Sequence, residues 1–184
     1  MVDEQQAERQ TRRWVEQVIV GLNFCPFAKN ELVQNTLRIS VSDATTMEAA
    51  LHRLADEWRL MDEDGNIETT LLVFSHGFER FDDFLTLLDY ADRLLEMQGY
   101  VGTYQLAHFH PDYCFADSDA TDAANYTNRS PCPTLHIIRE ASMEEVLRRF
   151  PNPEAIPVRN MELARSKGLE VMREILAGCI AGEK

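Results

Sequence analysis

The chain has 184 residues, of which 45% are hydrophobic, and it carries a formal net charge of -13 at pH 7. This length and apolar content fit one domain over residues 1–184. The negative charge argues against binding to nucleic acid or to an anionic membrane, because both carry phosphates that a basic protein surface neutralises.

The N-terminal region predicts one helix and one strand. Trp14 and Val18 recur at helical spacing within a stretch from about Gln5 to Val20, and Gly21 is a suitable stop. Apolar and polar side chains then alternate over Leu37–Val41. This alternation predicts a strand whose polar side faces solvent.

A second helix and a second strand follow. Thr45 and Glu48 form a capping box with Thr45 as the N-cap, which predicts a helix that ends near Met61. Thr69–Phe74 is an almost continuous apolar run. Such a run is typical of a central strand that is buried on both faces.

The middle of the chain predicts a helix over Phe81–Gln98, with Gly99 as its C-terminal cap. The inward side of this helix is expected to carry Phe84, Leu85, Leu88, Ala91 and Leu95. Two further strands are predicted over Thr103–Phe109 and Thr134–Arg139.

Two helices are predicted at the C-terminal end. A second capping box starts at Ser142 and predicts a short helix from there. The last helix is expected to run from about Arg159 to Ile180, with Ala164, Gly168 and Met172 on its inward stripe.

The order of these elements predicts an α/β or α+β sandwich, in which a mixed sheet of about four strands packs against helices. Two helical crossovers favour parallel pairing among the first three strands, and the fourth is expected to be antiparallel. Between the third and the fourth predicted strands, the segment from His110 to Pro133 has more than 20 residues without a periodic pattern. Loops of that length inside a domain are usually either functional or disordered, and the aromatic residues and prolines of this one favour a functional loop.

His108 and His110 are two residues apart at the end of the third predicted strand, so both imidazoles are expected on one face of the sheet. This geometry suits an acid and a base in catalysis. It also suits two ligands of a divalent metal, with His136, Cys25 or Asp112 as the third. The structural alternative is that His108 packs in the core and His110 ends the strand.

The long loop carries a second group of polar residues. Arg129 lies among amide and hydroxyl side chains, those of Asn125, Asn128 and Ser130. A guanidinium with such neighbours suits a carboxylate or phosphate, whereas the alternative is a loop whose polar side chains satisfy its own backbone. His136 is a further candidate substrate-binding residue, and strand alternation places it on the face opposite to Arg139.

Cys25 is the third candidate position. Phe24, Pro26 and Phe27 surround it, and Ala28 stands where a redox turn would carry a second cysteine. The residue is either a buried structural cysteine or a nucleophilic thiol paired with His108 or His110.

The localisation follows from two further features of the sequence. It contains neither a secretory signal nor a run of about 18 apolar residues, so we expect a cytoplasmic protein. The four cysteines form no CxxC pair, and in a reducing compartment they are expected to be thiols.

Three motifs resemble an uncharacterised bacterial family built around a domain of unknown function. They are GLNFCPFA at residues 21–28, FHPDY at residues 109–113 and NYTNRSP at residues 125–131. The resemblance covers nearly the whole chain. It implies no established reaction and no catalytic residue.

Three functions remain open from the sequence. The first is a small-molecule enzyme, a hydrolase or transferase, that binds an anionic substrate in a pocket joining Cys25, His110 and Arg129. The second is a metal-binding protein that uses His108 and His110. The third is a non-catalytic interaction module that forms a homodimer through its last helix.

Overall fold

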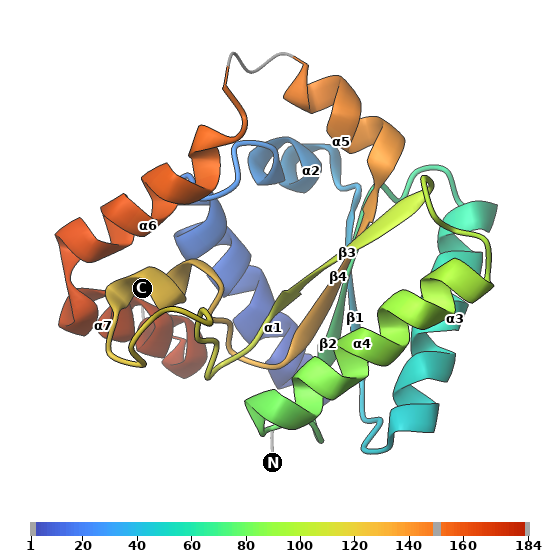
Figure 1. Cartoon of the computed structure of the whole chain (residues 1–184), viewed down its shortest axis with the longest axis horizontal. Helices are drawn as coiled ribbons and strands as arrows, with labels where there is room; N and C mark the ends of the chain where they lie inside the picture. The colour runs from blue at the N-terminus through green and yellow to red at the C-terminus, as the bar shows by residue number, and fades with distance from the viewer. Residues whose placement is uncertain (1–2, 149–151, 183–184) are drawn as a thin grey trace.

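A mixed sheet of four strands forms the centre of the molecule, with helices on both of its faces (Figure 1). The computed structural model describes residues 3–148 and 152–182. The strands are β1 (Leu37–Ser42), β2 (Thr69–Phe74), β3 (Tyr104–Phe109) and β4 (Thr134–Arg139). The α-helices are α1 (Glu4–Trp14), α2 (Ala28–Gln34), α3 (Met47–Glu63), α4 (Phe81–Met97), α5 (Glu140–Leu147), α6 (Ala155–Lys167) and α7 (Leu169–Ala181). The π-helix η1 (Val15–Val20) and the 3-10 helix η2 (Ala123–Thr127) complete the described elements.

The strands lie in the order β1-β2-β4-β3. β1 and β2 are parallel, whereas β4 is antiparallel to both of its neighbours. The predicted antiparallel fourth strand is confirmed. The predicted parallel pairing among the first three strands is correct for β1 and β2. β3 does not pair with either of them, because β4 lies between β2 and β3. This insertion places His136 between Leu71 and Ala107, in the middle of the sheet.

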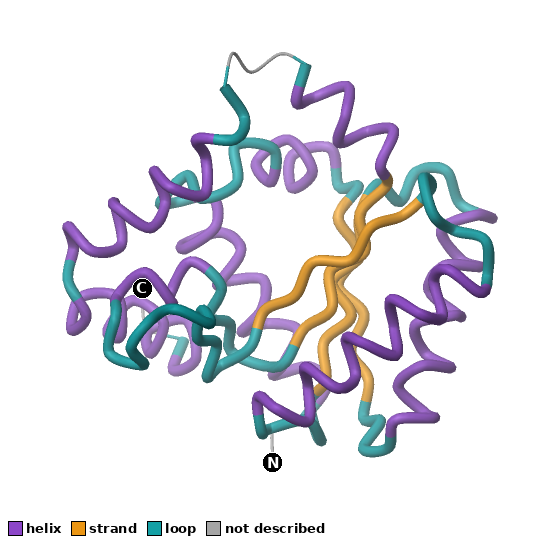
Figure 2. Tube along the Cα trace, viewed as in Figure 1, coloured by secondary structure: helices purple, strands orange, loops and turns teal. Residues whose placement is uncertain are grey.

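The helices divide into two layers (Figures 1 and 2). α3 and α4 cover one face, where Leu72, Leu135 and Ile137 join their buried side chains. α1, η1, α6 and α7 lie on the other face, where Leu71 and Val73 are buried. The predicted α/β sandwich is therefore correct. Within the described residues, no helix is both long and apolar enough to cross a membrane.

The N-terminal helix has the predicted extent, but its second half, η1, is a π-helix. It runs without a break from α1 into η1 and ends at Gly21, whose N–H donates to the carbonyl of Glu16 at 3.0 Å. The carbonyl of Gln17 also lies close to this turn. A Cβ on Gly21 would be only 2.2 Å from its oxygen, so the position favours glycine. Asn23 follows with a φ of 54°, so the chain turns sharply toward α2.

The polar side of β1 is mostly buried, with only Arg38 partly exposed, so the expectation that this side faces solvent is wrong. Ser40 and Ser42 are buried, and Ser40 contacts Glu57 of α3. The Ser40 hydroxyl donates to Glu57 Oε1 at 2.6 Å, and Arg38 Nε donates to Glu57 Oε2 at 2.8 Å. A carboxylate on α3 therefore pairs with the polar face of the strand and allows the helix to cover it.

Several helix limits also differ from those predicted. Thr46, not Thr45, caps α3, because its hydroxyl accepts from the N–H of Ala49 at 3.3 Å. α5 begins at Glu140, directly after β4, rather than at Ser142.

The final helix is broken. Gly168 has a φ of 88° and separates α6 from α7, so the predicted helix over 159–180 is two helices. A left-handed backbone costs glycine little, which explains why the break falls there.

Two smaller differences concern α4 and α2. The buried side of α4 carries Leu87, whereas Leu85 and Leu88 are only partly buried. α2 was not predicted, and none of its residues is fully buried.

Candidate functional site

A cavity of about 490 Å³ lies between the sheet and the helices that cover its α1 face. Its walls come from α1, η1, α2, α5 and α6, together with β2 and β4. Most of the lining is apolar or aromatic and includes Trp14, Phe24, Phe27, Leu71, Phe109, Phe115, Met143 and Met161. Small-molecule sites in proteins have this range of volume and this character, with a few polar groups that orient the ligand.

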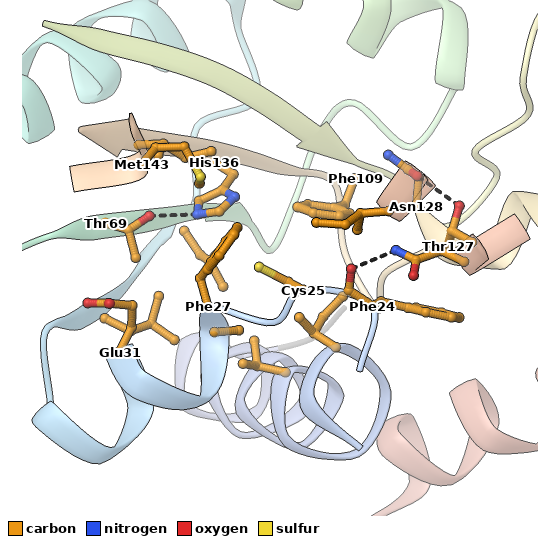
Figure 3. Close-up of a pocket in the computed structure, with 18 of the residues that line it drawn as sticks. Phe24, Cys25, Phe27, Glu31, Thr69, Phe109, Thr127, Asn128, His136 and Met143 are labelled. Atoms are coloured by element: carbon orange, nitrogen blue, oxygen red, sulfur yellow. Dashed lines mark hydrogen bonds between the residues drawn. The ribbon is translucent and has the colours of Figure 1, made fainter. Parts of the chain in front are cut away.

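His136 and Thr69 form the polar group on the floor of the cavity (Figure 3). The two residues lie on adjacent strands, and His136 Nε2 lies 2.6 Å from the Thr69 hydroxyl. The same hydroxyl donates to the carbonyl of Ile137 at 2.7 Å. Burial lowers the pKa of His136 to about 4, so the imidazole is neutral at pH 7.

Cys25 faces the same cavity from the turn between η1 and α2 (Figure 3). Two hydrogen bonds hold this turn: the N–H of Phe24 donates to the carbonyl of Ile19 at 2.9 Å, and Asn160 Nδ2 donates to the carbonyl of Phe24 at 2.6 Å. Burial raises the pKa of the Cys25 thiol. At neutral pH the residue is therefore a thiol rather than a thiolate.

The charged residues of the cavity are mainly acidic. Glu31 of α2 and Glu68, just before β2, both contribute to its lining. Arg139 also lines it, but Nε donates to the carbonyl of Ile67 at 2.8 Å and another guanidinium nitrogen donates to that of Met61. The guanidinium is thus engaged on the α3 side of the sheet, and no other Lys or Arg among the described residues lines the cavity.

His108 and His110 share one face as predicted, but it is the face toward α4. Their rings lie 6.2 Å and 5.3 Å from that of Phe84. His110 is fully buried; its Nε2 donates to the carbonyl of Phe78 at 2.9 Å and its Nδ1 accepts from the N–H of Asp112 at 3.0 Å. Both ring nitrogens of His110 therefore have protein partners. Burial lowers the pKa of both histidines.

Of the two alternatives for Cys25, pairing with His108 or His110 therefore does not fit the structure. The sheet separates them, because strand alternation directs His108 toward α4 while the Cys25 turn lies on the α1 side. Among the residues that the structure describes, no group of three His, Cys, Asp or Glu side chains is placed to hold a metal ion. The four cysteines are free thiols, as expected.

Arg129 binds its own loop in this structure. Its Nε donates to the carbonyl of Tyr113 at 3.1 Å, another nitrogen donates to that of Ala120 at 3.0 Å, and the guanidinium stacks on Tyr126 at 4.6 Å. It does not line the cavity. This geometry matches the structural alternative for the loop rather than a guanidinium directed at a ligand in the cavity.

Of the amide and hydroxyl residues beside Arg129, two bind their own loop as Arg129 does. Asn125 is fully buried and accepts from the N–H of Phe115 at 3.0 Å, while Ser130 donates to the carbonyl of Cys132 at 2.6 Å. Asn128 alone of this group lines the cavity. The structure thus brings together Cys25, Asn128 and His136 from the predicted set.

Thr69 and Glu31 are cavity residues that the sequence did not single out. Thr69 begins a buried strand and resembles any other strand residue, and Glu31 lies on the helix that was not predicted. Nothing in the local sequence distinguishes either residue.

A family model described as "Protein of unknown function (DUF1415)" matches residues 6–174. The chain belongs to this family. The matched range includes every residue that lines the cavity. No curated protein and no solved structure matches the chain.

Proposed function

We propose that this protein binds a small, largely apolar molecule in the cavity between the sheet and α1, α2, α5 and α6. The observation that carries this proposal is the cavity itself, which has a volume of about 490 Å³ and mostly apolar walls. Apolar surface of this kind gains free energy when a ligand displaces its water.

The ligand is expected to be uncharged or cationic rather than anionic. The predicted anion site depended on Arg129, which donates to loop carbonyls instead. Glu31 and Glu68 would repel a carboxylate or a phosphate near the cavity. Cys25, Asn128 and His136 supply polar contacts that do not need a charged partner.

Fluorescence titration with Nile red, a neutral dye that brightens in apolar surroundings, tests the proposal. The wild-type protein should bind the dye at a saturable site. Val146→Trp should weaken binding at least about tenfold, because Val146 of α5 lines the cavity and the indole would fill part of it.

Val33→Trp is the matched control, since Val33 is 72% exposed on α2 and does not line the cavity. This variant should bind the dye as the wild type does. Equal loss of binding in both variants, or no saturable binding by the wild type, would overturn the proposal.

A hydrolase or transferase reaction at Cys25 is the second candidate function. It is favoured by one observation, the presence of a thiol and an imidazole in the same cavity. The pKa values argue against this reaction. Burial raises the pKa of Cys25 and lowers that of His136, so both groups stay neutral at pH 7. Nucleophilic cysteines instead have lowered pKa values.

The pH dependence of alkylation distinguishes the two functions. Iodoacetamide reacts with thiolates, and peptide mass spectrometry can follow Cys25 with Cys114, another partly buried thiol, as an internal reference. A ligand-binding role predicts that Cys25 reacts only at alkaline pH. Rapid reaction of Cys25 at pH 6 to 7 would favour the enzyme instead.

A further inference from the structure

The Thr69 hydroxyl determines which nitrogen of His136 carries the proton. This hydroxyl has one hydrogen and two close partners, the carbonyl oxygen of Ile137 at 2.7 Å and His136 Nε2 at 2.6 Å. A carbonyl can only accept, so the hydroxyl hydrogen goes to Ile137. His136 Nε2 must then carry a hydrogen and donate it to the Thr69 oxygen.

The other ring nitrogen of His136 is consequently an acceptor. A neutral imidazole has one N–H, and Nε2 holds it, so Nδ1 presents a lone pair. Figure 3 shows this nitrogen on the side of the ring away from Thr69, toward Phe109. No hydrogen bond within residues 3–148 and 152–182 is seen at Nδ1, and His136 lines the cavity.

We propose that His136, fixed by Thr69, makes the cavity selective for apolar molecules that donate a hydrogen bond, such as an aromatic amine or phenol. This inference rests on the proposed function, since it names the class of ligand that the cavity takes. Thr69 acts as a positioning residue, and His136 Nδ1 is the atom that the ligand contacts.

The surroundings of His136 support this selectivity over recognition of an anion. Protonation would turn Nδ1 into a donor, but burial lowers the pKa of His136 to about 4 and keeps the ring neutral. Arg139, the one cationic side chain at the described cavity wall, is engaged on backbone carbonyls. Glu31 and Glu68 add negative charge. An anionic ligand would therefore meet the His136 lone pair and two carboxylates, without a free cationic side chain among the described lining residues.

Three tricyclic probes of similar shape test the inference. 1-Aminoanthracene donates a hydrogen bond, 1-methoxyanthracene only accepts one, and anthracene-1-carboxylate is an anion. In wild-type protein the amine should bind roughly threefold to tenfold more tightly than the ether, the usual effect of one hydrogen bond. The carboxylate should bind at least about a hundredfold more weakly than the amine, because its charge would be buried without a partner.

Variants of Thr69 separate positioning from packing. Thr69→Val keeps the shape of the side chain but removes the oxygen that fixes the tautomer, so the preference for the amine over the ether should fall to about twofold or less. Thr69→Ser retains the hydroxyl and should keep the preference. A purely structural role for Thr69 would lower both affinities together and leave their ratio unchanged.

Long-range ¹H–¹⁵N NMR spectra of the histidine side chains report the tautomer directly, and His136→Gln assigns the signal. The inference requires an Nε2–H tautomer in the wild type, and a mixed population in Thr69→Val. An Nδ1–H tautomer, or equal affinity for the amine and the ether in the wild type, would overturn the selectivity while leaving the cavity as a binding site. Failure of all three probes and of Nile red would overturn the binding function as well.

Discussion

Lowering the pH should destabilise the protein through His136. In the unfolded chain this imidazole takes up a proton as the pH falls below about 6.5. In the folded protein burial lowers its pKa to about 4, so the ring stays neutral over that range. The unfolded state therefore binds more protons between these values, and the free energy of unfolding falls as the pH falls.

The difference between a pKa of about 6.5 and one of about 4 corresponds to roughly 3 kcal/mol in full. About 2 kcal/mol of this is lost between pH 7.5 and pH 5, with most of the loss below pH 6.5. The contribution is fully present above the unfolded value and disappears as the pH approaches the folded one.

Urea unfolding at about pH 7.5, 6.5, 5.5 and 5 measures the effect in the wild type and in His136→Gln. Glutamine can donate to Thr69 but does not titrate, so the variant should lose about 2 kcal/mol less than the wild type over this range. His108 and His110 also have pKa values lowered by burial, but their contributions are common to both proteins and cancel in the difference.

His52→Gln serves as the control, because that side chain is 76% exposed on α3. It should follow the wild-type pH dependence. If His136→Gln and the wild type lose stability in parallel, within about 0.5 kcal/mol, His136 is not held neutral by burial and the reasoning fails.

Three further outcomes follow from the fold. Gly21→Ala should lower the free energy of unfolding by about 1–3 kcal/mol, since the new Cβ would lie 2.2 Å from the carbonyl oxygen of Gln17; an unchanged urea midpoint would contradict this contact. Glu57→Gln should cost about 1–3 kcal/mol by leaving the Arg38 guanidinium without its carboxylate under α3, and a variant as stable as the wild type would show that the cluster contributes little. Arg129→Lys should leave Nile red affinity unchanged but accelerate hydrogen exchange in its loop, because lysine lacks the fork that donates to two carbonyls; weaker dye binding would instead indicate that Arg129 contacts the ligand.

The sequence by itself determined the features that depend on near neighbours. β2 and β4 have the limits that the sequence predicts, Thr69–Phe74 and Thr134–Arg139. Strand alternation also placed His108 and His110 on one face and His136 opposite to Arg139, because successive side chains of a strand point to opposite sides wherever the strand lies.

Tertiary structure decided which of these faces meet. His136 and Thr69 are 67 residues apart, and their contact depends on β4 inserting beside β2, which no local pattern encodes. The buried polar face of β1 likewise depends on Glu57 arriving from α3. Cys25 shares a cavity with His136 rather than with His110 because the turn after η1 lies on the α1 side of the sheet. Local periodicity fixes the direction of a side chain within its element, but only the packing of distant elements decides which side chain it contacts.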